Sequence, residues 1–315
     1  MSIFDKIRHT CRQVCESAKH VKINSGNLLN YLNSLPLATP LVMDEENHFC
    51  GDSAKTVNYF FVLDSINFGS GYFPHLRLIP GKTGYFTVAA QLKEELHRRG
   101  DLNCDFLTNI RPEECCRIFN QDLNSPKAFE LMQLFAQAMN QLGEFVETKF
   151  SGSFTRLLDS ANGSSARLVE TLAEMPFYQD KAIYRDFEVF FMKRAQITVS
   201  DLNIALAGKN EALFEDIEQL TIFADNLVPH VLKIDGILSY SNELQQMVEQ
   251  QNPVEAGSVF ELEMRAAAVH TVELLKAIAA DKGRLITAQQ LDYHLWNRGQ
   301  AKIYRRPHLT LSHFY

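Results

Sequence analysis

The sequence has no excess of positive charge. Its 315 residues include 31 lysines and arginines against 38 aspartates and glutamates, a formal net charge of −7, and no lysine- or arginine-rich run occurs. Proteins that bind a long stretch of DNA or RNA usually present a basic surface. The charge therefore argues against a DNA or RNA duplex as partner. It is compatible with a single nucleotide, which needs only one or two cations.

Long hydrophobic runs are also missing. No stretch of residues is apolar for the length that a membrane-spanning helix requires, and the first six residues, MSIFDK, lack the character of a signal peptide. We therefore expect an intracellular, cytoplasmic protein that does not interact with a membrane.

The six cysteines follow no metal-binding or disulfide pattern. No C-x-x-C pair and no partnered histidine spacing accompany them, so we predict buried free thiols and no zinc site. Neither an H-E-x-x-H helix nor a G-x-S-x-G elbow is present, which excludes the common metalloprotease and serine hydrolase motifs.

Two glycine-containing stretches lack the context of a phosphate-binding loop. Residues 80–83 (PGKT) match the end of a P-loop, but the leading glycine is replaced by Leu76 and no buried strand precedes it. Residues 69–71 (GSG) lack the strand and helix of a dinucleotide-binding turn. These glycines are more typical of tight turns beside a pocket.

Helical periodicity, by contrast, is abundant. Apolar side chains recur at three- and four-residue spacing, whereas the alternation typical of strands is scarce. With 46% hydrophobic residues, the chain can bury a substantial core. We predict a mainly α fold with few or no strands, as one domain over residues 1–315 or as two closely packed helical lobes with the active site between them. The predicted helices cover residues 3–18, 126–150, 164–175, 186–206, 257–280 and 287–296.

One carboxylate lies inside an apolar run. Asp225 is flanked by Ile222, Phe223, Leu227 and Val228. A buried carboxylate without a partner is costly, so a cation, a ring of hydrogen-bond donors or a catalytic role must compensate for it. A helix N-cap or a buried ion pair is the commoner explanation for a single aspartate.

Five segments carry a more specific pattern when they are taken together. They are residues 58–68 (NYFFVLDSINF), 193–202 (KRAQITVSDL), 221–229 (TIFADNLVP), 261–265 (ELEMR) and 291–296 (LDYHLW). In this order they resemble the NY…LLDSLNF, KRAQI…SDL, TMFADYRVPQ, EIEIR and LDYYLW blocks of the queuosine salvage protein family, the queuosine 5′-phosphate N-glycosylases. The resemblance runs from about residue 55 to the C-terminal tyrosine.

The sequence departs from the family pattern at three places. Asn226 and Leu227 stand where the family has Tyr-Arg, and His230 stands where it has Gln. Residues 69–74 replace an aromatic run, as in a bacterial-type variant. These changes affect the fine shape of the pocket.

The resemblance implies a fold akin to the helix-hairpin-helix DNA glycosylases. It also implies hydrolysis of queuosine 5′-monophosphate to queuine and ribose 5-phosphate, for salvage of queuine into tRNA modification, with no metal and no organic cofactor. Two alternatives stay open. A nucleic-acid base glycosylase should carry a basic stripe, and a non-catalytic protein that binds 7-deazaguanine or a nucleotide would not need Asp225 and Lys193 together.

The chemistry of N-glycosidic cleavage suggests the catalytic residues. The transition state resembles an oxocarbenium ion, so Asp225 beside C1′ would stabilise the cation, activate water or attack directly. Lys193 would keep Asp225 ionised, or bind the phosphate or the leaving base. Lys193, Arg194 and Lys82 are the cations that we expect to favour the 5′-monophosphate over the nucleoside.

The remaining matched residues are predicted to bind substrate. Asp64 would accept hydrogen bonds from the N1–H and 2-amino edge of the base, and Phe68 would stack on it, unless Phe68 is an ordinary core residue. Asp292 would pair with the ammonium of the cyclopentenediol arm or contact the ribose, with a structural ion pair as the alternative. Asn67, Phe223 and His230 complete this set. Glu263 and Arg265, which face different sides of one predicted helix, are interpreted as structural anchors.

Overall fold

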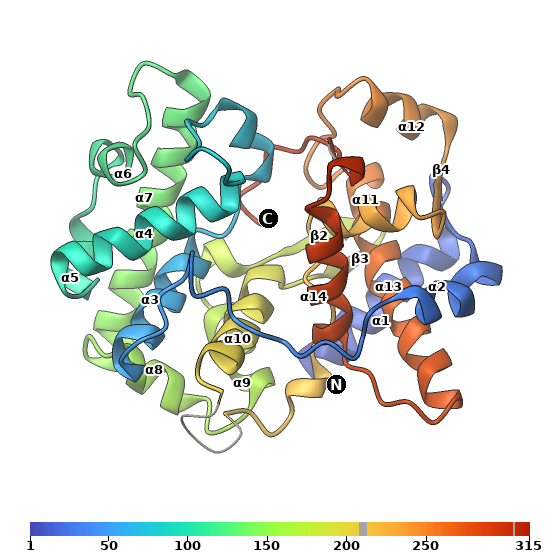
Figure 1. The fold of residues 1–315 in the computed structure, drawn as a ribbon, viewed down its shortest axis with the longest axis horizontal. Coiled ribbons are helices and arrows are strands. Elements are labelled where there is room, and N and C mark those ends of the chain that lie inside the picture. Colours follow the sequence, from blue (N-terminus) through green and yellow to red (C-terminus); the bar gives the residue numbers. More distant parts are fainter. Residues whose placement is uncertain (208–212, 305) are drawn as a thin grey trace.

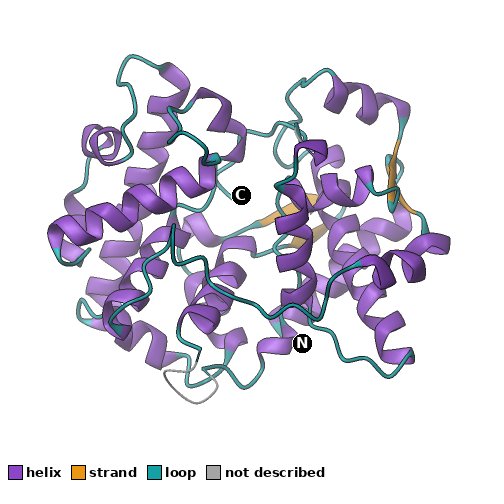
Figure 2. Cartoon of the chain, in the orientation of Figure 1, coloured by secondary structure: helices purple, strands orange, loops and turns teal. Residues whose placement is uncertain are grey.

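The computed structural model describes residues 1–207, 213–304 and 306–315, and helices dominate them (Figures 1 and 2). The helices are α1 (Ile3–Ser17), α2 (Leu28–Ser34), α3 (Ser53–Ser65), α4 (Gly84–Arg99), α5 (Cys104–Asn109), α6 (Pro112–Ile118), α7 (Pro126–Phe150), α8 (Phe154–Ser160), α9 (Ser165–Leu172), α10 (Lys193–Ala205), α11 (Leu227–Ile234), α12 (Asn242–Glu249), α13 (Val259–Asp281) and α14 (Ala288–Gly299). The strands are β1 (Val21–Ile23), β2 (Lys181–Tyr184), β3 (Phe187–Phe190) and β4 (Leu238–Tyr240). Short 3₁₀ turns are η1 (Ser25–Asn27), η2 (Ser70–His75), η3 (Pro176–Tyr178), η4 (Ile217–Gln219) and η5 (Lys302–Tyr304). The prediction of a mainly α fold is confirmed.

Local sequence signals explain where the long helices begin. The predicted helix 126–150 coincides with α7, which has Pro126 in its first turn. Ser258 caps α13 by accepting a hydrogen bond from the amide of Glu261. Thr287 forms a reciprocal capping box with Gln290 at the start of α14. These helices lie within a few residues of their predicted positions.

The predicted helix 186–206 is wrong in its first part. Residues 187–190 form β3, which pairs antiparallel with β2, and α10 begins only at Lys193. Arg185, in the two-residue turn of this hairpin, has a φ of 55°, a conformation that usually requires glycine or asparagine. Neither residue is present in the turn, so local sequence carries no signal for this hairpin. The second sheet pairs β1 with β4 across most of the chain.

The helices gather in two groups on either side of the C-terminus (Figure 1). In one group α7 packs against α3, α5, α6 and α8, and in the other α13 packs against α1, α2, α11 and α14. Helix α10 packs against α3 and α9. One cluster of buried apolar side chains extends through both groups, from Ile3 to Tyr304. Whether the groups are separate lobes stays a prediction.

Five of the cysteines are free thiols, namely Cys11, Cys15, Cys104, Cys115 and Cys116, and all of these except Cys15 are buried. Along the described residues, none of the helices combines the length and the apolar character that crossing a bilayer needs.

Candidate active site

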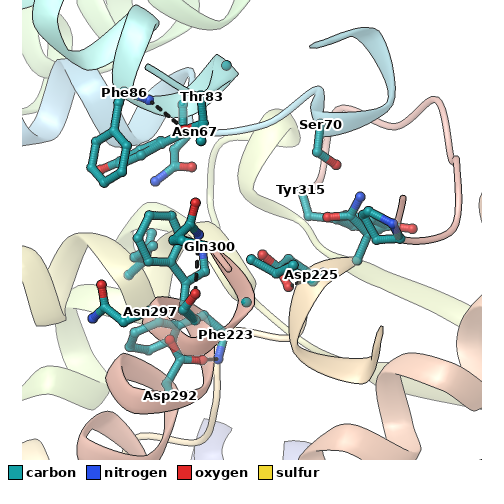
Figure 3. Close-up of a pocket in the computed structure, with 18 of the residues that line it drawn as sticks. Asn67, Ser70, Thr83, Phe86, Phe223, Asp225, Asp292, Asn297, Gln300 and Tyr315 are labelled. Carbon is teal, nitrogen blue, oxygen red and sulfur yellow. Dashed lines mark hydrogen bonds between the residues drawn. The ribbon is translucent and has the colours of Figure 1, made fainter. Parts of the chain in front are cut away.

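A cavity of ≈ 970 Å³ lies between η2, the start of α4, one face of α10, the loop before α11, α14 and the C-terminal segment (Figure 3). This volume is at the upper end of the range for small-molecule sites. Aromatic side chains form much of the wall. They are Phe68, Phe73, Tyr85, Phe86, Phe223, Tyr293, Trp296 and Tyr315.

Asp225 lines this cavity from the loop that precedes α11. Its Oδ1 accepts hydrogen bonds from the amides of Leu227 (2.8 Å) and Val228 (3.0 Å), so the carboxylate also caps the helix. Enclosure raises the pKa of Asp225 above its usual value, and the nearby Lys193 together with the two amides opposes this rise. The capping role and the cavity position therefore coexist in one residue.

Lys193 is the first residue of α10 and is almost completely buried. Its Nζ donates to the backbone oxygen of Asn67 (3.0 Å) and to Asn67 Oδ1 (3.2 Å). Burial lowers the pKa of Lys193, and the charge of Asp225 opposes this change. Lys193 and Asp225, both among the described residues, interact through the cavity without a direct ion pair.

One buried network holds both residues in place. Asp180 Oδ2 accepts from the amide of Lys193 (3.0 Å) and from Arg265 Nη2 (2.6 Å). Arg265 Nε in turn donates to the backbone oxygen of Ala224 (2.9 Å), the residue before Asp225. The start of α10 and the loop with Asp225 are thus fixed to the same guanidinium. Arg265 is the structural anchor that the sequence predicted.

Glu263, the second predicted anchor, holds the N-terminal part of the chain. Its carboxylate accepts hydrogen bonds from three consecutive amides, those of Lys19, His20 and Val21, and from the hydroxyl of Tyr184. It faces away from Arg265 and does not line the cavity.

Asp64 does not line the cavity, which corrects the prediction of a direct contact with the base. Helix α3 is buried on every side from Thr56 onward, and Asp64 is 0% exposed behind Asn67. Asn67 Nδ2 donates to Asp64 Oδ1 (3.3 Å), while Asn67 Oδ1 accepts from Lys193. Burial raises the pKa of Asp64 to about 7. Among the described residues, Asp64 is linked to the cavity wall by its hydrogen bond with Asn67.

Phe68 lines the cavity beside Asn67 but also belongs to the core. Its ring makes an edge contact with Phe135 (5.3 Å between centroids), and the guanidinium of Arg194 lies 4.7 Å from its centroid. Phe68 is therefore a core residue that also forms part of the cavity wall, and its stacking on the base stays a prediction.

Asp292 and Phe223 contact each other on the side of the cavity opposite Asn67 (Figure 3). Asp292 Oδ1 accepts from the amide of Phe223 (2.9 Å), and both residues line the wall. Burial raises the pKa of Asp292 to about 8, with Asp225 adding to the rise. Since no cation is paired directly with it among the described residues, the structural ion pair is not the explanation for Asp292.

His230 is not brought into the cavity, contrary to its predicted position. It lies on α11, five residues after Asp225, and is buried near His308. Asp225 itself belongs to the loop before this helix, so no shared helical face brings the two side chains together.

The sequence reasoning missed Asp201 as a cavity residue. This carboxylate lines the wall from the middle of α10 and forms no hydrogen bond or ion pair with the described residues. Burial and Asp64 hold the pKa of Asp201 well above its usual value. The helical spacing of α10 contains a signal for Asp201. One face of this helix carries the residues that line the cavity, which are Lys193, Ile197, Ser200, Asp201 and Ile204.

Two of the cations expected to bind phosphate lie elsewhere. The Arg194 guanidinium is buried and donates to the backbone oxygens of Ser65 and Phe177. Lys82 is ion-paired with Glu46 (2.8 Å) outside the cavity. Lys193 is the one lysine in the wall formed by the described residues, and Arg306 lies exposed at its edge.

The cavity therefore holds more acidic groups than cations. The pKa values of Asp201, Asp225 and Asp292 are all raised, which favours a ligand that brings a positive charge to them. Within the described residues, no group of three or more His, Cys, Asp or Glu side chains is arranged to hold a metal ion. The fold and the site define a helical protein with an acidic, aromatic-walled cavity for a small planar molecule.

Comparison with known proteins identifies the family. The sequence model of one family, described as queuosine salvage protein, matches residues 47–315. Similar proteins occur in Sphaerobacter thermophilus (33% identity over 298 residues, 92% of this chain and 91% of the relative), Dictyostelium discoideum (32% over 329 residues, 98% of each) and Bos taurus (30% over 263 residues, 78% and 76%). All three are named queuosine 5′-phosphate N-glycosylase/hydrolase. The chain belongs to the queuosine salvage protein family, as its motifs predicted.

Proposed function

We propose that this protein hydrolyses queuosine 5′-monophosphate. Water adds to C1′ of the ribose, the C1′–N9 bond breaks with its electron pair passing to the base, and a proton completes queuine, leaving ribose 5-phosphate. The observation that carries the proposal is Asp225, a fixed carboxylate in the wall of a nucleotide-sized cavity. The names of the relatives from three distant organisms support the substrate.

Asp225 would stabilise the positive charge that develops on the ribose. Two backbone amides hold one of its oxygens, and Lys193 favours its ionised form. A carboxylate that is already bonded to two donors is a weak base, but its negative charge is fixed in position before the reaction begins. Such a preorganised charge is worth most in the transition state, where the oxocarbenium character is greatest.

Lys193 would assist departure of the base. Queuine is a 7-deazaguanine and has no N7 to protonate, so its negative charge must be eased by donors to N3 or O6. The ammonium of Lys193 has three donors, and among the described residues its hydrogen bonds go to Asn67. The Asp64–Asn67–Lys193 chain therefore positions a cation beside Asp225. In this proposal Asp64 is a positioning residue.

Asp201 and Asp292 would receive the cyclopentenediol arm of the base. This arm carries a secondary ammonium, and both carboxylates line the cavity with raised pKa values. A cation between them would favour their ionised forms and form charge-assisted hydrogen bonds. Phe223, which is tied to Asp292 through its amide, would pack against the base.

The partner in this proposal is a free mononucleotide. The net charge of −7 does not favour binding to a DNA or RNA duplex. We propose a single domain in which the cavity lies between the two helix groups. A cytoplasmic setting fits the free thiols of Cys11, Cys15, Cys104, Cys115 and Cys116, because reducing compartments keep thiols unpaired. Kinship with the helix-hairpin-helix glycosylases stays a prediction.

The direct test is incubation with queuosine 5′-monophosphate and quantification of both products. We expect queuine and ribose 5-phosphate in equal amounts, at a rate proportional to enzyme concentration. Tight binding of the nucleotide without product would instead identify a ligand-binding protein. Release of bases from DNA or RNA with no action on the mononucleotide would identify a nucleic-acid glycosylase.

A further inference from the structure

One wall of the cavity contains buried polar groups without partners. Neither ring nitrogen of His308 forms a hydrogen bond with the described residues, and the same holds for the buried hydroxyl of Ser70. His308 is only 1% exposed, and both residues line the cavity. Buried polar groups in folded proteins nearly always have partners, so two such groups in one wall point to a polar ligand.

The wall is assembled from three parts of the chain that are distant in sequence. The amide of Gly69 donates to the backbone oxygen of Tyr315 (2.9 Å). At Gly71 an added Cβ would lie 2.1 Å from the backbone oxygen of Thr310, so only glycine permits this approach. Ser70, between the two glycines, is thereby held against the C-terminal segment that carries His308.

The same segment also touches the loop that contains Asp225. Asn226 Nδ2 donates to the backbone oxygen of His308 (3.4 Å). In the close-up, Ser70 and Tyr315 lie on one side of Asp225, and Asp292 lies on the other (Figure 3). We call the side of the cavity with Ser70 and His308 the donor wall and the side with Asp201 and Asp292 the acidic wall. The two walls thus flank Asp225, the carboxylate that we place beside C1′.

The donor wall has the chemistry of an anion site. Burial and the charge of Glu261 raise the pKa of Tyr315, but Glu261 is ion-paired with Arg265 (3.2 Å) and therefore does not repel an anion strongly. Burial, His230 and Arg265 lower the pKa of His308 to about 3, so its ring is neutral and offers one N–H. Arg306, exposed at the same end of the cavity, forms no ion pair with the described residues.

We propose that Ser70 and His308 bind the 5′-phosphate of the substrate, with Arg306 supplying positive charge at the mouth. This inference rests on the proposed function. It orients the nucleotide, with the ammonium arm on the acidic wall, the ribose beside Asp225 and the phosphate against the C-terminal segment. It also replaces Arg194 and Lys82, which face away from the cavity, as the source of selectivity for the 5′-monophosphate.

The first test compares two substrates in each variant. His308→Gln and Ser70→Ala should each lower kcat/KM for queuosine 5′-monophosphate by ~10- to 100-fold, the usual effect of losing a hydrogen bond to a charged group. The value for the nucleoside queuosine should change less than ~3-fold by the same principle. His294→Gln is the matched control, because His294 is also a buried histidine but does not line the cavity.

The second test does not depend on catalysis. Calorimetry with ribose 5-phosphate should detect binding to the wild type and to His294→Gln, and binding weaker by ~10-fold or more to His308→Gln. If wild type fails to hydrolyse the nucleotide but this binding pattern holds, the proposed function is wrong and the anion site stands. If His308→Gln does not fold, the same measurements on Ser70→Ala test the phosphate assignment by themselves. An equal loss for nucleotide and nucleoside, or unaltered binding of ribose 5-phosphate, would overturn the phosphate assignment.

Discussion

Two groups of buried charges in this protein behave differently. The anchor cluster consists of Asp180, Glu261 and Arg265, and the cavity cluster of Lys193, Asp201, Asp225 and Asp292. In the anchor cluster the guanidinium is ion-paired with Asp180 (2.6 Å) and Glu261 (3.2 Å). In the cavity cluster none of the described side chains forms a direct ion pair. Burial raises the pKa of its three carboxylates, as it does that of Glu261 in the anchor cluster, so the ion pairs are what differ.

This contrast separates charges that support the fold from charges that await a ligand. Buried ions with complete sets of partners leave little to gain from another molecule, because their desolvation is already compensated. The cavity carboxylates have no cation partner among the described residues, although backbone amides donate to Asp225 and Asp292, so they can still gain from a bound cation. The anchor residues are buried, as are Lys193 and Asp292, whereas Asp201 and Asp225 are half-buried in the cavity wall. Burial and partner geometry together therefore distinguish the two clusters.

The largest effect should follow from breaking the anchor cluster. Arg265→Met leaves Asp180 and Glu261 buried without their cation, and such a loss typically destabilises a protein by ~3–5 kcal/mol. Unfolding in urea would measure it. Arg77→Met is the control, since its pair with Asp122 is exposed and should contribute less than ~1 kcal/mol. Equal losses in the two variants would mean that the anchor cluster is not structural.

Asp225→Asn should instead reduce catalysis and leave the fold intact. The asparagine Oδ1 still accepts from Leu227 and Val228, so the cap persists, but the negative charge beside C1′ is lost. We expect kcat to fall at least ~10²- to 10³-fold with little change in Kd. Lys193→Met should also lower kcat, and the double variant should be less than additive if the two act together. Turnover within tenfold of wild type would make Asp225 a purely structural cap.

Asp201→Asn tests whether Asp201 binds the ammonium arm of the base. Loss of one charge-assisted hydrogen bond to the ammonium arm should weaken queuine binding by ~10- to 100-fold. Binding of 7-deazaguanine, which lacks the arm, should hardly change. Calorimetry with both bases would show this difference, and Asp186→Asn in the exposed β2–β3 turn is the control. A similar loss for both bases would remove Asp201 from recognition of the arm.

A separate effect concerns stability and pH. The pKa of Asp292 rises from 3.8 to about 8 on folding, so between these values the folded protein binds more protons than the unfolded chain. The contribution of Asp292 to stability therefore decreases as pH rises through this window and is constant outside it. In the ligand-free protein, Asp292→Asn should flatten the fall of Tm between pH 5 and pH 8. An unchanged slope would show that Asp292 is not buried as a neutral acid.

Much of the helical framework could be predicted from local patterns. The apolar spacing of α7, the cap of α13 and the capping box of α14 are all properties of neighbouring residues. The β2–β3 hairpin could not be predicted, because Arg185 adopts its left-handed conformation only within the folded context. Asp64 was misplaced for a related reason. Helix α3 is apolar all round, so its pattern gives no direction to any one side chain.

The sequence by itself determined a mainly helical protein of the queuosine salvage family, and it identified Asp225, Lys193, Asn67, Phe68, Phe223 and Asp292, all of which line the cavity. Only the tertiary structure decided that Asp64 and His230 lie outside it, that Asp201 lies in it, and that Ser70 meets the segment with His308. The physical reason is that periodicity and motifs depend on neighbours along the chain. The partners of a buried charge or hydroxyl are set by packing between segments that are far apart in sequence.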